Sequence, residues 1–348
     1  MKIAHVMNKA LVQGTPARIA HYWGRYFAEH SGIAVVLRRS ASYEQNIKCI
    51  TSWHDSIAPN GFVSGYNCPK DLIRDIIKEA DVVHFHDDCY PSILESHKWK
   101  CNLKNKRLVF QAHIGSIPDN YFHMNRKFAW DKRVRHASIP NGYGRIFDKV
   151  TADSNGKRVW YRLSDVLDLS HPVYAPNNSL RFPMEYVPMK VVYTYSNHRE
   201  GSKINAKRPL GHMRLLKQAK VNYEMCTGRS FEFAMALKKT AHVVLEEIFT
   251  PYLHLSALEG LAVGAMVLTN FDAYTKREVC EFLDASEREW PFYYVTPDTI
   301  VKELIKLKHE PEIVREYGKK GREWILKYHE PKRILEKFIR FYENTRVC

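Results

Sequence analysis

The chain has 348 residues, of which 45% are hydrophobic and 26% charged, and its formal net charge is +15 at pH 7. This is an ordinary globular composition, which excludes collagen-like, coiled-coil and wholly disordered proteins. Because single hydrophobic cores stop growing near about 250–300 residues, two domains are expected.

The charge predicts the kind of partner. The 53 Lys and Arg exceed the 38 Asp and Glu, which favours a polyanionic neighbour such as phosphates, nucleic acid or an acidic membrane face. The alternative is a solvated basic surface without such a partner. The sequence has no run of about 18 apolar residues and no signal-peptide core, so we expect a cytoplasmic protein, peripheral at the inner membrane face if it binds anionic lipid. Seven cysteines without a Cys-x-x-Cys pair favour reduced thiols over disulfides or a zinc ribbon.

Strand and helix patterns alternate through the first half of the chain. Short apolar runs predict strands at 2–7, 33–37, 81–85 and 107–111. Helical spacing predicts a helix that begins at Thr15-Pro16 and ends before Ser31, and a second helix over 71–79. Strands separated by helices indicate βαβ units and a parallel sheet.

The middle of the chain is less regular. Residues 120–136 are basic and aromatic, which fits either a surface for anionic lipid or nucleic acid, or a helix that packs its aromatic side chains inward. Residues 173–188 contain three prolines and are interpreted as the domain linker.

The alternation restarts after this linker. Strands are predicted at 190–195, 242–248 and 265–269, and helices at 209–220 and 255–263, whereas 221–240 is only weakly patterned. From 299 onward the chain is mostly helical and ends in a basic amphipathic helix over 331–343. The prediction is an N-terminal Rossmann-like domain at 1–176, a second Rossmann-like domain at 177–330, and a C-terminal segment, 331–348, that packs back on the first domain.

Residues 250–268 form the sharpest motif, which reads as loop, helix, glycine and strand. The helix N-terminus near Leu255-Ser256 carries unpaired backbone N–H groups and the positive end of the helix dipole, and this suits a diphosphate. Glu259 lies about one turn further along, where its carboxylate can accept hydrogen bonds from a ribose. Gly264 allows the tight turn into the next strand.

The segment Leu258-Glu259-Gly260-Leu261-Ala262-Val263-Gly264-Ala265-Met266-Val267 resembles a phrase of the GT-B glycosyltransferases, especially the sugar-nucleotide-dependent family 4. The resemblance implies two Rossmann-like domains facing across a cleft, with the nucleotide sugar held by the C-terminal one. It assigns the ribose contact to Glu259 and places Tyr252, Leu255 and Ser256 in the donor site. The chain departs from the family at Pro251, where an earlier glutamate is common, and at Met266, which replaces a proline.

A second match runs from 191 to 209, where the family has a strand, a loop with two cations and a helix. By resemblance Arg199 and Lys207 hold the donor diphosphate, with Lys203 as the alternative lysine. Such cations can clamp a diphosphate without a metal. In the first half, Gly14 matches a glycine loop near the transferred sugar, and His113 ends a strand near the sugar and acceptor.

The resemblance implies a glycosyltransferase that moves a sugar from a nucleotide-diphosphate sugar to a hydroxyl acceptor, with retention and without a metal or other cofactor. The acceptor is expected to be a cell-envelope saccharide or lipid-linked sugar, or alternatively DNA with hydroxymethylated bases; small molecules and proteins stay open. No stable protein partner is expected. Two rivals are a non-catalytic nucleic-acid-binding protein and a metallohydrolase using His84, His86 and Asp88.

Overall fold

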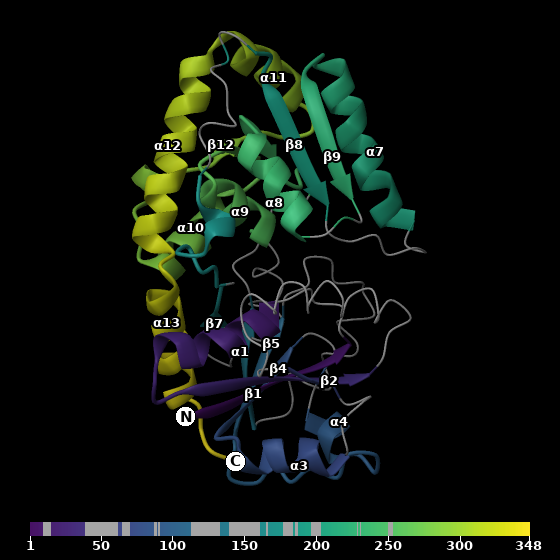
Figure 1. Ribbon diagram of the computed structural model, residues 1–348, viewed down its shortest axis with the longest axis vertical. Helices are drawn as coiled ribbons and strands as arrows, with labels where there is room; N and C mark the ends of the chain where they lie inside the picture. Colours follow the sequence, from purple (N-terminus) through teal and green to yellow (C-terminus); the bar gives the residue numbers. More distant parts are fainter. Residues whose placement is uncertain are drawn as a thin grey trace. The chain divides into compact units, whose positions relative to one another are not determined.

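The computed structural model describes most of the chain, and everything below refers to that part. The described residues are 1–9, 15–38, 62–64, 70–86, 89, 91–112, 133–138, 161–164, 166–176, 184, 187–195, 203–227, 229, 231–249 and 253–348. They form two compact units, each with a parallel sheet and flanking helices (Figure 1). The first unit comprises Met1–Ile139, Tyr143–Val166 and Pro331–Cys348, and the second comprises Pro140–Gly142 and Leu167–Glu330.

The first unit contains a seven-stranded sheet in the order β3-β2-β1-β4-β5-β6-β7, with all neighbouring strands parallel. Its strands are β1 (Lys2–Lys9), β2 (Ser31–Arg38), β3 (Phe62–Ser64), β4 (Val82–His86), β5 (Arg107–Ala112), β6 (Val134–Ser138) and β7 (Tyr161–Arg162). Its helices are α1 (Thr15–Tyr26), α3 (Lys70–Glu79), α4 (Pro91–Glu95) and α13 (Pro331–Glu343). The predicted early strands and helices are confirmed, including the return of the C-terminal helix to the first unit.

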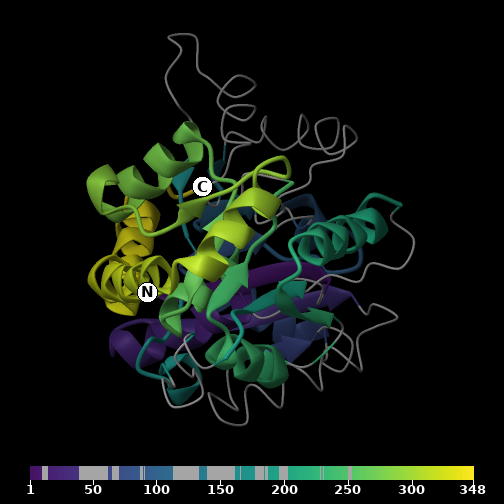
Figure 2. The same cartoon turned by 90° about the horizontal axis from the view of Figure 1, so that it is seen from above.

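Side-chain alternation divides this sheet into two buried faces. Ala4 and Val6 of β1 and Val83 of β4 join a core cluster with Ile73 and Ile77 of α3. Residues one position away along each strand point to the opposite face. That face is covered by α1 and α13, which lie side by side (Figures 1 and 2). Because both faces are covered, β4 is buried along its whole length, as is typical of parallel sheets.

The second unit contains a five-stranded parallel sheet in the order β12-β11-β10-β8-β9. Its strands are β8 (Lys190–Tyr195), β9 (Asn222–Thr227), β10 (Val243–Leu245), β11 (Met266–Thr269) and β12 (Tyr293–Tyr294). Its α-helices are α7 (Lys203–Gln218), α8 (Phe231–Thr240), α9 (Leu255–Ala262), α10 (Ala273–Leu283), α11 (Ile300–His309) and α12 (Pro311–Tyr328), and its 3-10 turns are η1 (Pro172–Tyr174) and η3 (Glu287–Glu289).

Two sequence predictions need correction in this unit. The helix expected from Pro209 begins at Lys203, so Pro209 lies inside α7, where it has no backbone N–H to donate along the helix. The weakly patterned stretch 221–240 holds a regular strand, β9, and a regular helix, α8. The turn between α9 and β11 is as predicted, because Gly264 adopts a left-handed φ of 73°.

The strand order reverses once in each sheet. In the first unit the chain passes from β1 outward to β3 and returns to β4 on the other side of β1, so the reversal lies between β1 and β4. In the second unit it lies between β8 and β10. Ligands of open α/β sheets bind at the carboxyl ends of the strands beside such a reversal. These two strand ends are therefore the places to look for a site.

The cysteines bear on the expectation of reduced thiols, and the helices on the expectation that no segment spans a membrane. In the described part of the chain, Cys101, Cys226 and Cys280 are buried free thiols, Cys89 is buried and Cys348 is half-buried. Burial raises the pKa of Cys101 and of Cys280 to about 11. The helices that the structure describes include none with the length and apolar character required to cross a bilayer.

Candidate functional site

The carboxyl ends of β8 and β10 meet the N-terminus of α9 in the second unit. α9 begins after His254, whose extended backbone makes it the N-cap residue. The first turn of a helix has backbone N–H groups without partners inside the helix, and the helix dipole is positive there. This edge of the sheet can therefore accept an anion, as the sequence motif predicts for Leu255 and Ser256.

A buried ion pair lies directly behind this helix terminus. The Nζ atom of Lys238 on α8 donates to the Oε2 atom of Glu259 on α9 at 2.6 Å, and the two side chains are 1% and 8% exposed. The same ammonium donates to Ser256 Oγ at 2.9 Å and to the Ser256 carbonyl oxygen at 3.4 Å. Ser256 Oγ also shares a 2.9 Å hydrogen bond with Thr194 Oγ1 near the end of β8. The network joins a strand and two helices at the point where the strand order reverses.

A second acid lies next to this network at the end of β10. Glu246 is buried, and its Oε1 atom lies 3.0 Å from Nδ1 of His254 and accepts the backbone N–H of Glu247 at 3.0 Å. Burial opposes the charge of Glu246, but the hydrogen bond and positive charge of His254, together with the Glu247 N–H and the charge of Lys238, outweigh it and hold the pKa of Glu246 below its ordinary value. The His254 side chain is 34% exposed, so it stays accessible from outside.

The structure brings together only part of the predicted donor site. Leu255, Ser256 and Glu259 share α9, with Glu259 buried and the other two half-buried. Lys203 and Lys207 lie in the first turns of α7, whose side chains there are outside the description. The remaining predicted positions are outside the described residues; they are Gly14, His113, Arg199 and Tyr252.

Sequence reasoning missed four side chains of this edge: Thr194, Lys238, Glu246 and His254. Two of them carried a usable signal, because Glu246 directly follows a buried strand and His254 directly precedes a helix. Polar residues at these places lie at the ligand-binding edge of a parallel sheet. Lys238 carried no such signal because its helix was not predicted.

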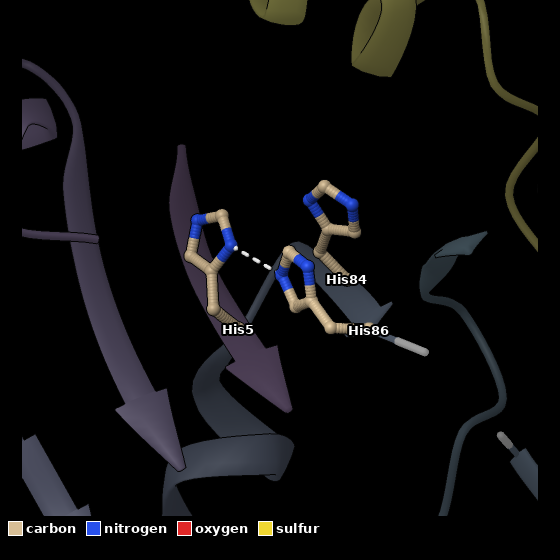
Figure 3. Close-up of side chains that lie close together, drawn as sticks. All are labelled: His5, His84 and His86. Carbon is tan, nitrogen blue, oxygen red and sulfur yellow. Dashed lines mark hydrogen bonds between the residues drawn. The ribbon is translucent and has the colours of Figure 1, made fainter. Parts of the chain in front are cut away.

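A histidine cluster lies at the corresponding reversal point of the first unit. His5 of β1 and His84 and His86 of β4 are fully buried, and the centroids of their rings lie 4.1–5.3 Å apart (Figure 3). His5 Nδ1 lies 3.0 Å from His86 Nε2, the contact drawn as a dashed line. His84 Nδ1 lies 2.8 Å from the hydroxyl of Tyr342 on α13. Burial raises the pKa of Tyr342, which keeps this hydroxyl protonated.

Three imidazoles this close could hold a metal ion, since one ligand atom from each lies within 4.8 Å of the others. The proton positions argue against this use. Trp23 Nε1 donates to His5 Nε2 at 3.0 Å, so the His5 proton is on Nδ1 and is donated to His86. A metal on Nδ1 would move that proton to Nε2, where it would oppose the indole N–H. The cluster is therefore a hydrogen-bonded core, and Asp88 of the metallohydrolase hypothesis lies outside the described residues.

No protein-family model and no curated protein sequence matches the chain. Solved structures do. An alpha-glucosyltransferase in complex with UDP is 11% identical with a TM-score of 0.61, and the alignment covers 99% of this chain and 100% of that one. An alpha-glucosyltransferase in complex with UDP and a 13-mer DNA is 12% identical with a TM-score of 0.60, and the alignment covers 99% of this chain and 100% of that one.

Two further solved structures show the same likeness. Anabaena HepE in complex with UDP-glucose is 9% identical with a TM-score of 0.63, covering 99% of each chain. A variant of S. aureus TarM in complex with fondaparinux, alpha-GlcNAc-glycerol and UDP is 10% identical with a TM-score of 0.60, covering 99% of this chain and 100% of that one. Both units are included in each alignment. The chain has the GT-B fold.

Proposed function

We propose that the chain is a glycosyltransferase that binds a UDP-sugar at the edge formed by β8, β10 and α9. The observation that carries the proposal is the Glu259 carboxylate, held at the first turns of α9 beside the strand-order reversal. A ribose hydroxyl is a suitable donor for that carboxylate, and the helix terminus suits the adjoining diphosphate. The UDP complexes of structures with the same fold support uracil as the base.

The remaining predicted residues complete the proposed donor site. The diphosphate is held by Arg199 together with Lys207, or Lys203 in its place, and Tyr252 before α9 and Leu255 at its first position complete the donor site. As the bond from the sugar to the diphosphate breaks, negative charge develops on the leaving oxygen, and these cations and the helix terminus stabilise it. Gly14 and His113 lie beside the transferred sugar in this proposal. The transfer is metal-independent and retains the configuration of the anomeric carbon.

The acceptor we propose is DNA that carries hydroxymethylated bases. The net charge of +15 suits a polyanion, and an alpha-glucosyltransferase with the same fold has been solved with UDP and DNA together. A cell-envelope saccharide or lipid-linked sugar is the second candidate, because TarM, solved with alpha-GlcNAc-glycerol, also has this fold.

The donor test is a thermal-shift screen against UDP, GDP, ADP, CMP and TDP with EDTA present. A ligand that binds the folded state raises its melting temperature by mass action. We expect a rise with UDP and UDP-sugars, and a smaller rise in Glu259→Gln. No shift with any nucleotide would reject the donor proposal and favour a nucleic-acid-binding protein without catalysis.

The acceptor test compares transfer from labelled UDP-glucose to three substrates. These are duplex DNA with 5-hydroxymethylcytosine, the same duplex with cytosine, and lipid-linked saccharide in anionic vesicles. Label in the first alone supports the DNA proposal, and its anomeric configuration, read by NMR, tests retention. Label in the vesicles alone would replace DNA by the envelope acceptor.

A further inference from the structure

The lysine behind α9 is buried without an evident need in the fold. Lys238 is 1% exposed, and lysine is almost never fully buried unless it is paired, as Lys238 is with Glu259. Removing an ammonium from water is costly, and a buried ion pair is weak evidence for stability because an apolar pair of similar volume often serves as well. Stability of the fold alone therefore does not account for the burial of Lys238, and the groups that its ammonium contacts become relevant.

The donors of Lys238 are all accounted for. An ammonium has three N–H groups, and three acceptors surround this one: Glu259 Oε2 at 2.6 Å, Ser256 Oγ at 2.9 Å and the Ser256 carbonyl oxygen at 3.4 Å. All three acceptors belong to the first turns of α9. Lys238 consequently keeps no donor for a ligand, which distinguishes it from a residue that binds phosphate directly.

The two oxygens of Glu259 are in different situations. Oε2 accepts from Lys238, whereas Oε1 makes no hydrogen bond with any residue in the described part of the chain. With one oxygen fixed, the side chain has little freedom to rotate, and the second oxygen is held in one direction. A charged acceptor held in this way can receive the hydroxyls of a ribose without first being ordered.

The same ammonium links α9 to the strand that leads toward Arg199. Ser256 Oγ, which accepts from Lys238, also bonds to Thr194 Oγ1 at 2.9 Å, and Thr194 is the next-to-last residue of β8. A change at Lys238 therefore reaches both chain segments that the proposed donor site uses.

We propose that Lys238 is a positioning residue that sets the ribose specificity of the donor site by holding Glu259 and Ser256. The inference rests on the proposed function, since it presumes that Glu259 contacts a ribose. It assigns to Lys238 no contact with the substrate. It predicts that loss of Lys238 weakens the recognition of ribose hydroxyls more than the recognition of the diphosphate.

The experiment compares the affinities for UDP and for its 2′,3′-dideoxy analogue, measured by calorimetry on the full chain. Hydrogen bonds to a charged group make the wild type prefer UDP by at least about tenfold. In Lys238→Met the preference should fall to about threefold or less. Lys239→Met is the matched control, because the neighbouring lysine donates instead to the Pro172 carbonyl oxygen and should leave the preference unchanged.

Two more variants separate positioning from general damage. If Lys238 acts through Glu259, the double variant Lys238→Met/Glu259→Gln should prefer UDP over the dideoxy analogue by the same factor as Glu259→Gln alone. Lys238→Gln is measured in parallel and takes the place of Lys238→Met if that variant fails to fold. The glutamine amide fills the space and still donates to one acceptor. The melting temperature of each variant is recorded without ligand.

The outcomes are distinct. A Lys238 variant with a lower melting temperature but the wild-type preference for UDP would show that the role of Lys238 is only structural and would overturn the inference. Equal wild-type affinity for both ligands would reject the ribose role of Glu259 and the inference with it, while the nucleotide proposal survives. If the wild type binds neither ligand, the proposed function itself fails.

Discussion

His254 and Glu246 join the N-terminus of α9 to the end of β10 through a 3.0 Å contact between Nδ1 and Oε1. The second oxygen of Glu246 is buried and has no hydrogen-bond partner among the described atoms. The contact with His254 therefore offsets much of the free-energy cost of burying this carboxylate. His254→Ala should cost about 1–3 kcal/mol of stability at neutral pH. Chemical denaturation of the wild type and the variant measures the difference.

This cost should depend on pH with a definite sign. The wild-type pKa of Glu246 is depressed, so its contribution is present above the ordinary pKa of 4.5 and is lost as the pH falls through the folded value. Without His254 the burial of Glu246 is less compensated, so this carboxylate should take up a proton at a higher pH than in the wild type, and the variant should lose less stability on acidification. The gap between wild type and variant should therefore shrink below about pH 5. A gap that widens on acidification would contradict this account of the pair.

The Lys238–Glu259 pair should be strongly non-additive in stability. Lys238→Met or Glu259→Leu alone leaves one buried charge without its partner, and each should cost about 3–5 kcal/mol. The double variant leaves no buried charge and should be less destabilised than either single one. Urea denaturation of the four proteins gives the coupling energy; strictly additive losses would show that the two charges do not compensate each other.

His329, between α12 and α13, should make the second unit sensitive to acid. It is fully buried, and burial lowers its pKa from 6.5 to about 4. Because the unfolded chain binds the proton more readily, the contribution of this neutral histidine, about 3 kcal/mol at most, is present above pH 6.5 and is lost as the pH falls toward 4. His329→Gln should have a shallower stability curve over this interval. Parallel curves would exclude His329 as a source of acid sensitivity.

Two helical glycines should respond oppositely to alanine. A Cβ on Gly318 of α12 would lie 2.7 Å from the backbone oxygen of Gly264, which cannot move aside, so Gly318→Ala should cost about 1–3 kcal/mol. A Cβ on Gly211 of α7 would meet only the ring tip of Phe249, a side chain 41% exposed. Gly211→Ala should then be neutral or stabilise by up to about 1 kcal/mol through helix propensity. Thermal unfolding of both variants provides the comparison.

The histidine cluster predicts one tautomer. Nitrogen-15 spectra should show the His5 proton on Nδ1 and a bare Nε2 that accepts from Trp23. Addition of zinc should leave these signals unchanged, and Trp23→Phe should release the constraint on His5. Stoichiometric zinc bound through His5 Nδ1 in the wild type would disprove the hydrogen-bonded description.

Much of the fold was predictable because buried parallel strands are short apolar runs. The strand 190–195 and the helix beginning at Leu255 have the predicted bounds or nearly so, since local pattern and tertiary burial agree there. The failure at 221–240 has a physical cause: β9 is an edge strand whose side chains are only partly buried, so its alternation is weak.

The candidate site was predictable in part for the same reason. Glu259 lies in a helix with a distinctive flanking sequence, which is why the sequence singles it out; its ribose contact stays a prediction. Lys238 was missed because its role depends on a contact with a residue 21 positions away, and no local spacing encodes that contact. A lysine in a weakly patterned segment looks like solvated charge until the packing of α8 against α9 is known.

The composition of the first unit bears on how the protein is synthesised. Its sheet comes from Met1–Val166, but one of the two helices on a sheet face, α13, and the hydroxyl that bonds His84 come from Pro331–Cys348. The backbone of Cys348 also bonds the backbone of Asn105 and Lys106. On the ribosome the sheet face that α1 and α13 share stays only partly covered, by α1, until residues 167–330 of the second unit have been translated. The nascent first unit thus leaves His84 without its Tyr342 partner while residues 167–330 are synthesised, and chaperone capture should be greatest in that interval.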